Sequence, residues 1–218
     1  MSSTHLESPR IEGTAVIRNE PVQARSAARL TALLDAAAHV VDEIGYERLT
    51  TAMVAERAGA SIGTVYRYFP DRIAVLQSLA ARNAERTSGL AIAEIGNPEH
   101  TDWYSALGAV FEIVKAAFRD EPGFASLRYG DVLDLRPATG RPAMQGFADS
   151  VFDALVARFQ LDDSDAARSA FSAVVVATDA LAARAYSRDP RGGEEFLLAG
   201  VATAGALLSP FWELPAAA

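Results

Sequence analysis

Hydrophobic residues in the first part of the chain recur at the spacing of a helix. One stripe of a helix over residues 23–44 is formed by positions spaced four, three, four and three apart, namely Leu30, Leu34, Ala37, Val41 and Ile44. Gly45 follows the last of them and is a typical residue for ending a helix. The pattern therefore predicts a first helix with one buried face.

Two shorter helices follow, over residues 52–58 and 62–69. Thr50 or Thr51 is suited to cap the first of them, since a threonine hydroxyl accepts a hydrogen bond from a free N–H at a helix start. Gly59 lies in the turn between the helices, where a positive φ is required. Two short helices joined by a tight turn are the outline of a helix-turn-helix, whose second helix enters the major groove of DNA.

The remainder of the chain also has helical periodicity, and no segment alternates like a strand. A fourth helix is predicted over 71–95, and the run Gly96–Pro98 breaks it. Further helices separated by proline, glycine or aspartate are predicted over 102–120, 122–134, 141–160, 164–187 and 193–213. The fold class is therefore all-α.

This pattern divides the chain into four parts. We expect a flexible N-terminal arm over 1–22, a three-helix helix-turn-helix domain over 23–70, a connecting helix over 71–96, and a helical bundle domain over 97–218. No apolar run approaches the roughly 18 residues that span a bilayer, and the N-terminus lacks the apolar centre of a secretory signal. We therefore expect no membrane partner and a cytoplasmic location.

The net charge of −8 is unevenly distributed. Residues 1–86 hold ten arginines and ten acidic residues, whereas residues 87–218 carry the whole excess of negative charge. A local basic surface remains compatible with DNA binding when the rest of the protein is acidic. The candidates for this surface are Arg18, Arg25, Arg29, Arg67 and Arg72; the alternative is that each is an ordinary solvated charge.

No motif for catalysis is present. The sequence has no cysteine, no G-x-S-x-G elbow, no phosphate-binding glycine loop and no H-E-x-x-H, and its three histidines are scattered. We therefore predict no catalytic residues, no metal site and no cofactor. An enzyme, or an all-helical interaction protein that does not bind DNA, is the alternative to a DNA-binding regulator.

The run LTTAMVAERAGASIGTVYRYFPDR resembles the DNA-binding segment of the TetR family of transcriptional regulators. The resemblance covers about residues 25–75 and is carried by Gly45-Tyr46, Thr50-Thr51, Ala58-Gly59, the stretch from Gly63 to Phe69, and Arg72. It implies a homodimeric regulator, with repression the expected activity, that binds a palindromic double-stranded operator. It also implies that a small-molecule effector, largely apolar, releases the DNA.

The candidate DNA-binding residues combine physical roles with this resemblance. A threonine at a helix start suits a phosphate, and the resemblance places Ile62, Gly63 and Thr64 nearest the base edges and the adjoining backbone. Tyrosine hydroxyls are expected on phosphates, and Arg67 is the only long cation of the reading helix. The full set is Arg29, Thr50, Thr51, Ser61, Ile62, Gly63, Thr64, Tyr66, Arg67, Tyr68 and Arg72.

The last two predicted helices, 164–187 and 193–213, are apolar on most sides and rich in small residues. Such helices must be buried on most sides, either in an intramolecular core or against a second copy. The resemblance implies that they form a four-helix bundle with the partner subunit of a homodimer.

The middle helices carry most of the aromatic residues. An apolar cavity with a few polar groups is what a small-ligand site requires, although ordinary core packing is the simpler explanation for any single aromatic. The candidate effector-binding residues are Trp103, Phe111, Phe118, Arg128, Tyr129, Met144 and Phe147.

Overall fold

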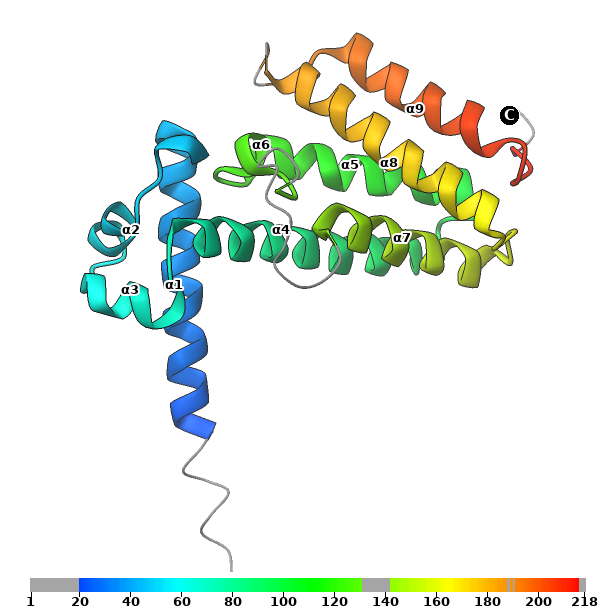
Figure 1. Ribbon diagram of the computed structural model, residues 1–218. Coiled ribbons are helices and arrows are strands. Elements are labelled where there is room, and N and C mark those ends of the chain that lie inside the picture. The colour runs from blue at the N-terminus through cyan, green and yellow to red at the C-terminus, as the bar shows by residue number, and fades with distance from the viewer. Residues whose placement is uncertain (1–19, 131–141, 188, 190, 216–218) are drawn as a thin grey trace, which may run out of the picture.

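The computed structural model describes residues 20–130, 142–187, 189 and 191–215, and all regular structure among them is helical (Figure 1). The elements in chain order are α1 (Glu20–Ile44), the 3-10 turn η1 (Tyr46–Arg48), α2 (Thr51–Arg57), α3 (Ile62–Tyr68), α4 (Arg72–Ile95), α5 (Trp103–Asp120), α6 (Phe124–Leu127), α7 (Ala143–Phe159), α8 (Asp165–Tyr186) and α9 (Glu194–Leu208). The predicted all-α class is confirmed.

The first three helices and the start of α4 enclose one hydrophobic core, which we call the head. Three residues of the predicted stripe of α1, Leu34, Ala37 and Val41, are buried in it, whereas Ile44 is partly buried and Leu30 is exposed. The other buried residues of this core include Leu49, Val54, Val65, Phe69, Val75 and Leu76. Thr50 caps α2 by accepting from the Met53 N–H at 3.2 Å, and Ser61 caps α3 by accepting from the Thr64 N–H at 3.1 Å. Gly59, with φ 58°, makes the turn between them. The N-terminal turns of α1 project beyond α2 and α3 (Figure 1).

A second core joins the far part of α4 to α5, α7, α8 and α9, and we call this part the body. Helix α4 runs out of the head and lies alongside α7, and α8 and α9 form an outer layer (Figure 1). Two tryptophans close its far end: the Trp103 Nε1 donates to the Glu213 carbonyl at 2.8 Å, and the Trp212 Nε1 donates to the Asp162 carbonyl at 3.0 Å.

Most helix boundaries lie within two residues of the expected ones, and three differ by more. Helix α1 begins at Glu20, inside the segment expected to be an arm, and residues 1–19 lie outside the described residues. The helix expected over 122–134 is only the four-residue α6, because Arg128 and Gly130 both have positive φ and stop it; residues 131–134 are not described. Helix α9 ends at Leu208 rather than at 213, just before Ser209-Pro210.

Helix α8 is long and apolar enough to cross a membrane by length and composition alone. Its contacts indicate a different role. It packs against α5, α7 and α9, and it carries Arg168 and Asp179 in ion pairs with other segments of the chain. A core helix of a helical bundle passes the same test of composition.

Candidate DNA interface and ligand cavity

Helix α3 presents a face that no described residue of the chain covers. Val65 and the following Phe69 are buried in the head, which fixes the rotation of the helix. Ile62 and Tyr66 are therefore turned outward and are 44% and 54% exposed. Gly63 lies on the same outer side, where a missing side chain permits close approach by another molecule. Exposed large apolar residues beside polar ones are typical of a binding surface.

Hydroxyl groups link the two short helices at this face. The Thr51 Oγ1 donates to the Tyr66 hydroxyl at 3.3 Å, so the first turn of α2 lies against the exposed face of α3. The Ser61 and Thr64 hydroxyls are 2.9 Å apart at the start of α3. Thr50, which caps α2, uses its hydroxyl on the backbone. The structure thus settles which threonine is the cap and leaves Thr51 beside the exposed face.

A cationic hollow lies between α1 and α3. It is lined by Arg25, Ser26, Ala28, Arg29, Ala32, Arg67 and Tyr68. The three arginines lie within ion-pair distance of no described carboxylate, and the Arg67 guanidinium lies 5.4 Å from the centre of the Tyr68 ring. Tyr68 is tied across the hollow to Ser26, with the two hydroxyl oxygens 3.2 Å apart. This arrangement concentrates unneutralised positive charge next to α3.

The other arginines of the head differ in their partners: Arg57 is neutralised by a carboxylate, whereas Arg48 and Arg72 donate to backbone carbonyls. Arg57 is 2.6 Å from Glu43, and this contact holds the pKa of the Glu43 carboxyl below its usual value. The Arg72 Nη1 donates to the Glu47 carbonyl at 2.7 Å, so this predicted DNA-binding residue also holds η1 in place. Its side chain is otherwise exposed. Arg57 is therefore compensated within the chain, whereas the arginines of the hollow and the exposed Arg72 keep a positive charge that an external anion could neutralise.

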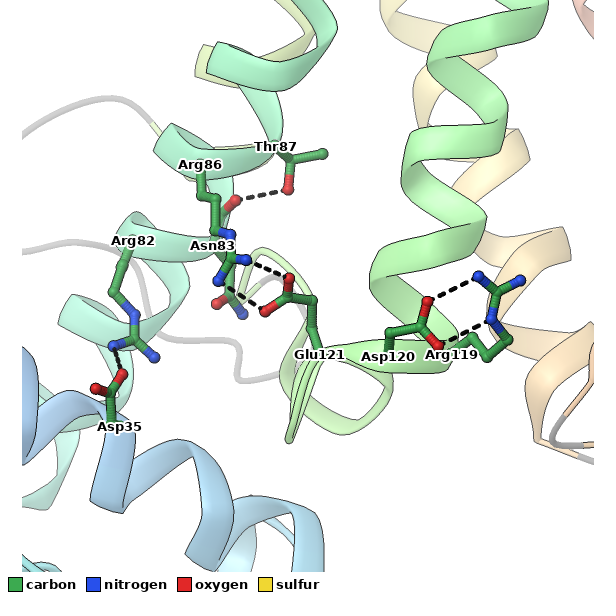
Figure 2. Close-up of polar contacts among 8 residues, drawn as sticks. All are labelled: Asp35, Arg82, Asn83, Arg86, Thr87, Arg119, Asp120 and Glu121. Carbon is green, nitrogen blue, oxygen red and sulfur yellow. Dashed lines mark hydrogen bonds and ion pairs between the residues drawn. The ribbon is translucent and has the colours of Figure 1, made fainter.

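The head and the body are joined along α4. Figure 2 shows Arg82 of α4 next to Asp35 of α1, and Arg86 of α4 next to Glu121, which follows α5. The guanidinium nitrogen lies 2.6 Å from the carboxylate oxygen in the first pair and 2.9 Å in the second. Both pairs lie at the surface, where each contributes little to stability. They help to position α4, because one connects it to α1 in the head and the other connects it to the end of α5 in the body.

The segment containing α6 makes a closer junction. Leu127 is completely buried in the core of the head, although it belongs to a segment between two body helices. The Gly123 N–H donates to the Asp42 carboxylate at 3.0 Å, and a Cβ at Gly123 would lie 2.7 Å from the Ala38 carbonyl oxygen. This segment therefore docks against α1 so tightly that only glycine fits at the contact.

The body contains a narrow apolar cavity of about 40 Å³ between α5, α7 and α8. Its lining comprises Leu107, Val110, Phe111, Val114, Lys115, Tyr129, Phe147, Val151, Phe171, Val174, Val175, Thr178, Asp179 and Ala182. Three predicted effector-binding residues, Phe111, Tyr129 and Phe147, are brought together here.

The other four predicted effector-binding residues do not line it. Trp103 packs on Trp212 at the far end of the body, and Met144 is buried in the core. Phe118 lies against Phe124 and Tyr186. Arg128 is not a lining residue, but its guanidinium is 3.3 Å from the carboxylate of Asp179, which is one. Aromatic content alone therefore did not separate cavity walls from ordinary core.

The sequence reasoning missed Asp179 and Lys115. Asp179 is buried and pairs with Arg128, whose backbone has the unusual angles φ 49° and ψ −122°. Such a conformation in a residue other than glycine costs about 1–3 kcal/mol and persists only when its surroundings enforce it. The available signal was a lone acidic residue inside the apolar run AFSAVVVATDALA, since a charge in a core helix needs a partner.

The outer layer of the body has its own uncovered face. The apolar side chains of Val176 on α8 and of Leu198, Val201 and Leu207 on α9 are exposed, two of them by more than half. Helices α8 and α9 pack side by side, so these residues belong to one layer of the molecule (Figure 1). A patch of this kind is typical of a protein–protein interface.

Comparison with known proteins finds two family models that match the chain. Residues 33–94 match the model for bacterial regulatory proteins of the tetR family, and residues 101–208 match the model for the tetracyclin repressor-like C-terminal domain. The HTH-type transcriptional repressor KstR of Rhodococcus jostii is 44% identical over 54 residues. That match covers 25% of this chain and 26% of the repressor, so the chain aligns with only about a quarter of that relative's length.

Solved structures match over a much greater length. A TetR-family transcriptional regulator from Streptomyces coelicolor superposes with a TM-score of 0.73 at 29% identity, covering 84% of this chain and 99% of that one. The regulator FadR from Bacillus subtilis, solved in complex with stearoyl-CoA, superposes with a TM-score of 0.56 at 16% identity, which shows a shared fold. It covers 84% of this chain and 99% of its own. The two family models together cover most of the chain, which therefore belongs to the tetR family of bacterial regulatory proteins.

Proposed function

We propose that this protein is a ligand-responsive transcriptional repressor that binds a palindromic operator as a homodimer and is released by a small-molecule effector. The observation that carries the proposal is the exposed face of α3, fixed by Val65 and Phe69 and flanked by the unpaired arginines of the hollow. It belongs to a family of regulators rather than of enzymes, and we assign it no catalytic residue. Such a protein acts in the cytoplasm.

In this proposal α3 lies in the major groove. Ile62, Gly63 and Thr64 approach the bases, and Arg67 contacts a base or a phosphate. Phosphates are bound by the remaining candidates: Arg29, Thr50, Thr51, Ser61, Tyr66, Tyr68 and Arg72. Arg25, which lines the same hollow as Arg29 and Arg67, is added to this set. Helix-turn-helix proteins distribute their contacts in this way. Contacts to the DNA phosphates fix the position of the protein along the duplex, and contacts to the bases give sequence specificity.

The dimer forms through the uncovered layer of α8 and α9. One head contacts few bases, so two heads on a two-fold axis are needed for a specific operator. Burying the exposed Val176 and Leu198 against a second copy supplies the apolar contact that an obligate dimer uses. Residues 97–218 then serve both dimerisation and effector binding, while 23–70 bind DNA and 71–96 connect the two.

The effector is expected in the cavity between α5, α7 and α8. Tyr129 lines the cavity, Arg128 precedes it, and Leu127 lies in the core of the head. Three consecutive residues thus run from the ligand site to the DNA-binding core. An effector that displaces Tyr129 would shift the head relative to the body, and the equilibrium between two arrangements of the dimer would change.

The names of similar proteins support an apolar effector. A fold neighbour was solved with stearoyl-CoA, and another is the fatty acid degradation regulator FadR of Bacillus halodurans. The cavity of the present chain is mainly apolar, which agrees with a ligand of the same general character.

The test is fluorescence anisotropy with DNA from upstream of the protein's own gene, measured from 50 to 300 mM salt. We expect saturable binding of a dimer per site, steeply weakened by salt because phosphate contacts release counterions. A shuffled DNA of equal length is the control. Equal affinity for both DNAs, or binding insensitive to salt, would overturn the proposal.

A further inference from the structure

The cavity in the body contains one polar group whose position predicts the chemistry of its ligand. The Tyr129 side chain lines the cavity, is only 3% exposed, and its hydroxyl makes no hydrogen bond within the described part of the chain. Thr87 is a polar side chain that acts on Tyr129, and its influence lowers the pKa of the phenol against the larger effect of burial. The two groups do not meet hydrogen-bond geometry, and the Thr87 hydroxyl donates to the Asn83 carbonyl at 2.7 Å instead. A buried hydroxyl without a partner is unfavourable, so a ligand acceptor that pairs with it removes this cost.

The Tyr129 hydroxyl is available as a donor. Burial raises the pKa of this phenol well above its ordinary value, and the negative charge of Asp179 acts in the same direction. The group therefore keeps its proton at any physiological pH. Its ring is held between Phe147, stacked at 5.1 Å, and Phe124, edge-on at 5.5 Å, so the hydroxyl has a restricted position.

The charged groups around the cavity are already compensated. Arg128 lies 3.3 Å from Asp179, and the Lys115 Nζ is 2.8 Å from the Glu112 carboxylate. The Thr178 hydroxyl donates to the Val174 carbonyl at 2.8 Å. A ligand carboxylate or ammonium placed among these apolar walls would find no uncompensated partner, and burying an unpaired charge is strongly unfavourable.

We propose that the cavity binds an apolar molecule carrying an uncharged oxygen acceptor, such as a ketone, ester or amide carbonyl, which accepts a hydrogen bond from Tyr129. This inference rests on the proposed function, since it assigns a chemical class to the effector of that same cavity. The cavity measures only about 40 Å³, so the ligand must displace side chains that line it. Tyr129 is one of these side chains, and it follows Leu127 and Arg128 in the chain.

The test uses three probes of one ring size: cyclohexanone, cyclohexane and cyclohexanecarboxylate. Binding to the full-length protein is measured without DNA, by calorimetry and by the shift in unfolding temperature. Because a ketone gives up its hydrogen bonds to water on binding, the readout is the ratio of the cyclohexanone affinity to the cyclohexane affinity, which we call the ketone preference. We expect this ratio to be about fivefold to tenfold higher in the wild type than in Tyr129→Phe, the value of one hydrogen bond, and the carboxylate to bind most weakly.

Two matched variants assign the effect to the hydroxyl. Tyr129→Phe should lower the ketone preference by about fivefold to tenfold and leave cyclohexane binding unchanged, while raising the unfolding temperature of the free protein because the unpaired hydroxyl is removed. Tyr186→Phe is the control, because Tyr186 stacks on Phe118 and does not line the cavity; it should keep the preference.

Three results would overturn the inference: no binding of any probe, equal weakening of all probes by Tyr129→Phe, or tightest binding of the carboxylate. The outcome is separable from the proposed function. If the protein binds its operator but its ketone preference is the same in Tyr129→Phe, only this inference is wrong. If the ketone preference falls in that variant but the protein does not bind an operator, only the proposed repressor function is wrong.

Discussion

At the scale of single residues, the decisive property is whether a charged or polar group already has a partner. The arginines of the head illustrate this, since Arg57 and Arg82 are paired with carboxylates and Arg67 is not. Paired guanidiniums stabilise local structure weakly at the surface, whereas the unpaired ones are left for DNA. Sequence alone does not distinguish these two groups, because the partners lie far apart in the chain.

The first prediction concerns Arg67. Replacing it by alanine should weaken operator binding at least tenfold and relax base preference, because a bidentate base contact is worth about 1–3 kcal/mol. Anisotropy titrations with operator and single-base variants measure both effects. Arg191→Ala, at a side chain that is 92% exposed in the body, is the control and should bind as the wild type does. Unchanged operator affinity and base preference in Arg67→Ala would show that Arg67 does not contact the operator.

The second prediction concerns the buried ion pair. Asp179→Asn should lower the free energy of unfolding by roughly 2–4 kcal/mol, because Arg128 then remains buried with an uncompensated charge. Urea titration with helical circular dichroism measures this loss. The double variant Arg128→Met with Asp179→Asn should regain part of it. If the single variant were as stable as the wild type, the ion pair would not contribute to the free energy of unfolding.

At the scale of elements, the short α6 has an importance out of proportion to its length. It places Leu127 in the core of the head and Gly123 against α1, while the following Tyr129 lines the body cavity. The sequence pattern predicted a longer helix here, because helical spacing continues past Leu127. Only the tertiary contacts of Arg128 and the positive φ of Gly130 explain why the helix stops.

The third prediction tests this junction. Gly123→Ala should destabilise the protein by about 1–3 kcal/mol, since the added Cβ meets the Ala38 carbonyl oxygen at 2.7 Å and φ is +72°. Gly89→Ala on α4 is the matched control: its Cβ meets nothing within 4 Å, and removing a glycine from a helix should stabilise slightly. Thermal unfolding compares the two. Equal shifts in both variants would contradict the tight docking of α6 on α1.

At the scale of the whole molecule, the exposed layer of α8 and α9 decides whether two heads act together. The fourth prediction is that the double variant Val176→Glu with Leu198→Glu is monomeric in sedimentation velocity and loses specific operator binding, because charges would be buried at the interface. Ile92→Glu, on an exposed position of α4, should remain dimeric. A double variant that stayed dimeric would place the interface elsewhere.

The fifth prediction concerns acid stability. Hydrogen bonds from Arg57, His100 and Arg119 lower the pKa values of Glu43, Glu94 and Asp120 below their ordinary values. A pKa that is lower in the folded state contributes stability above the unfolded value, and this is lost as the pH falls through the folded value. Unfolding temperature should therefore decline below about pH 4.5, and Glu43→Gln should reduce that decline. A constant unfolding temperature down to pH 3 would contradict it.

The sequence by itself determined the all-α class, the caps at Ser61 and at a threonine before α2, and the outward face of α3. These depend on spacing and local hydrogen bonds, which neighbouring residues decide. Only the tertiary structure decided which aromatics line the cavity, which arginines stay unpaired, and where the α6 helix stops. Each of these depends on contacts between residues distant in the chain, such as Arg128 with Asp179 or Gly123 with Ala38, which one-dimensional periodicity does not encode.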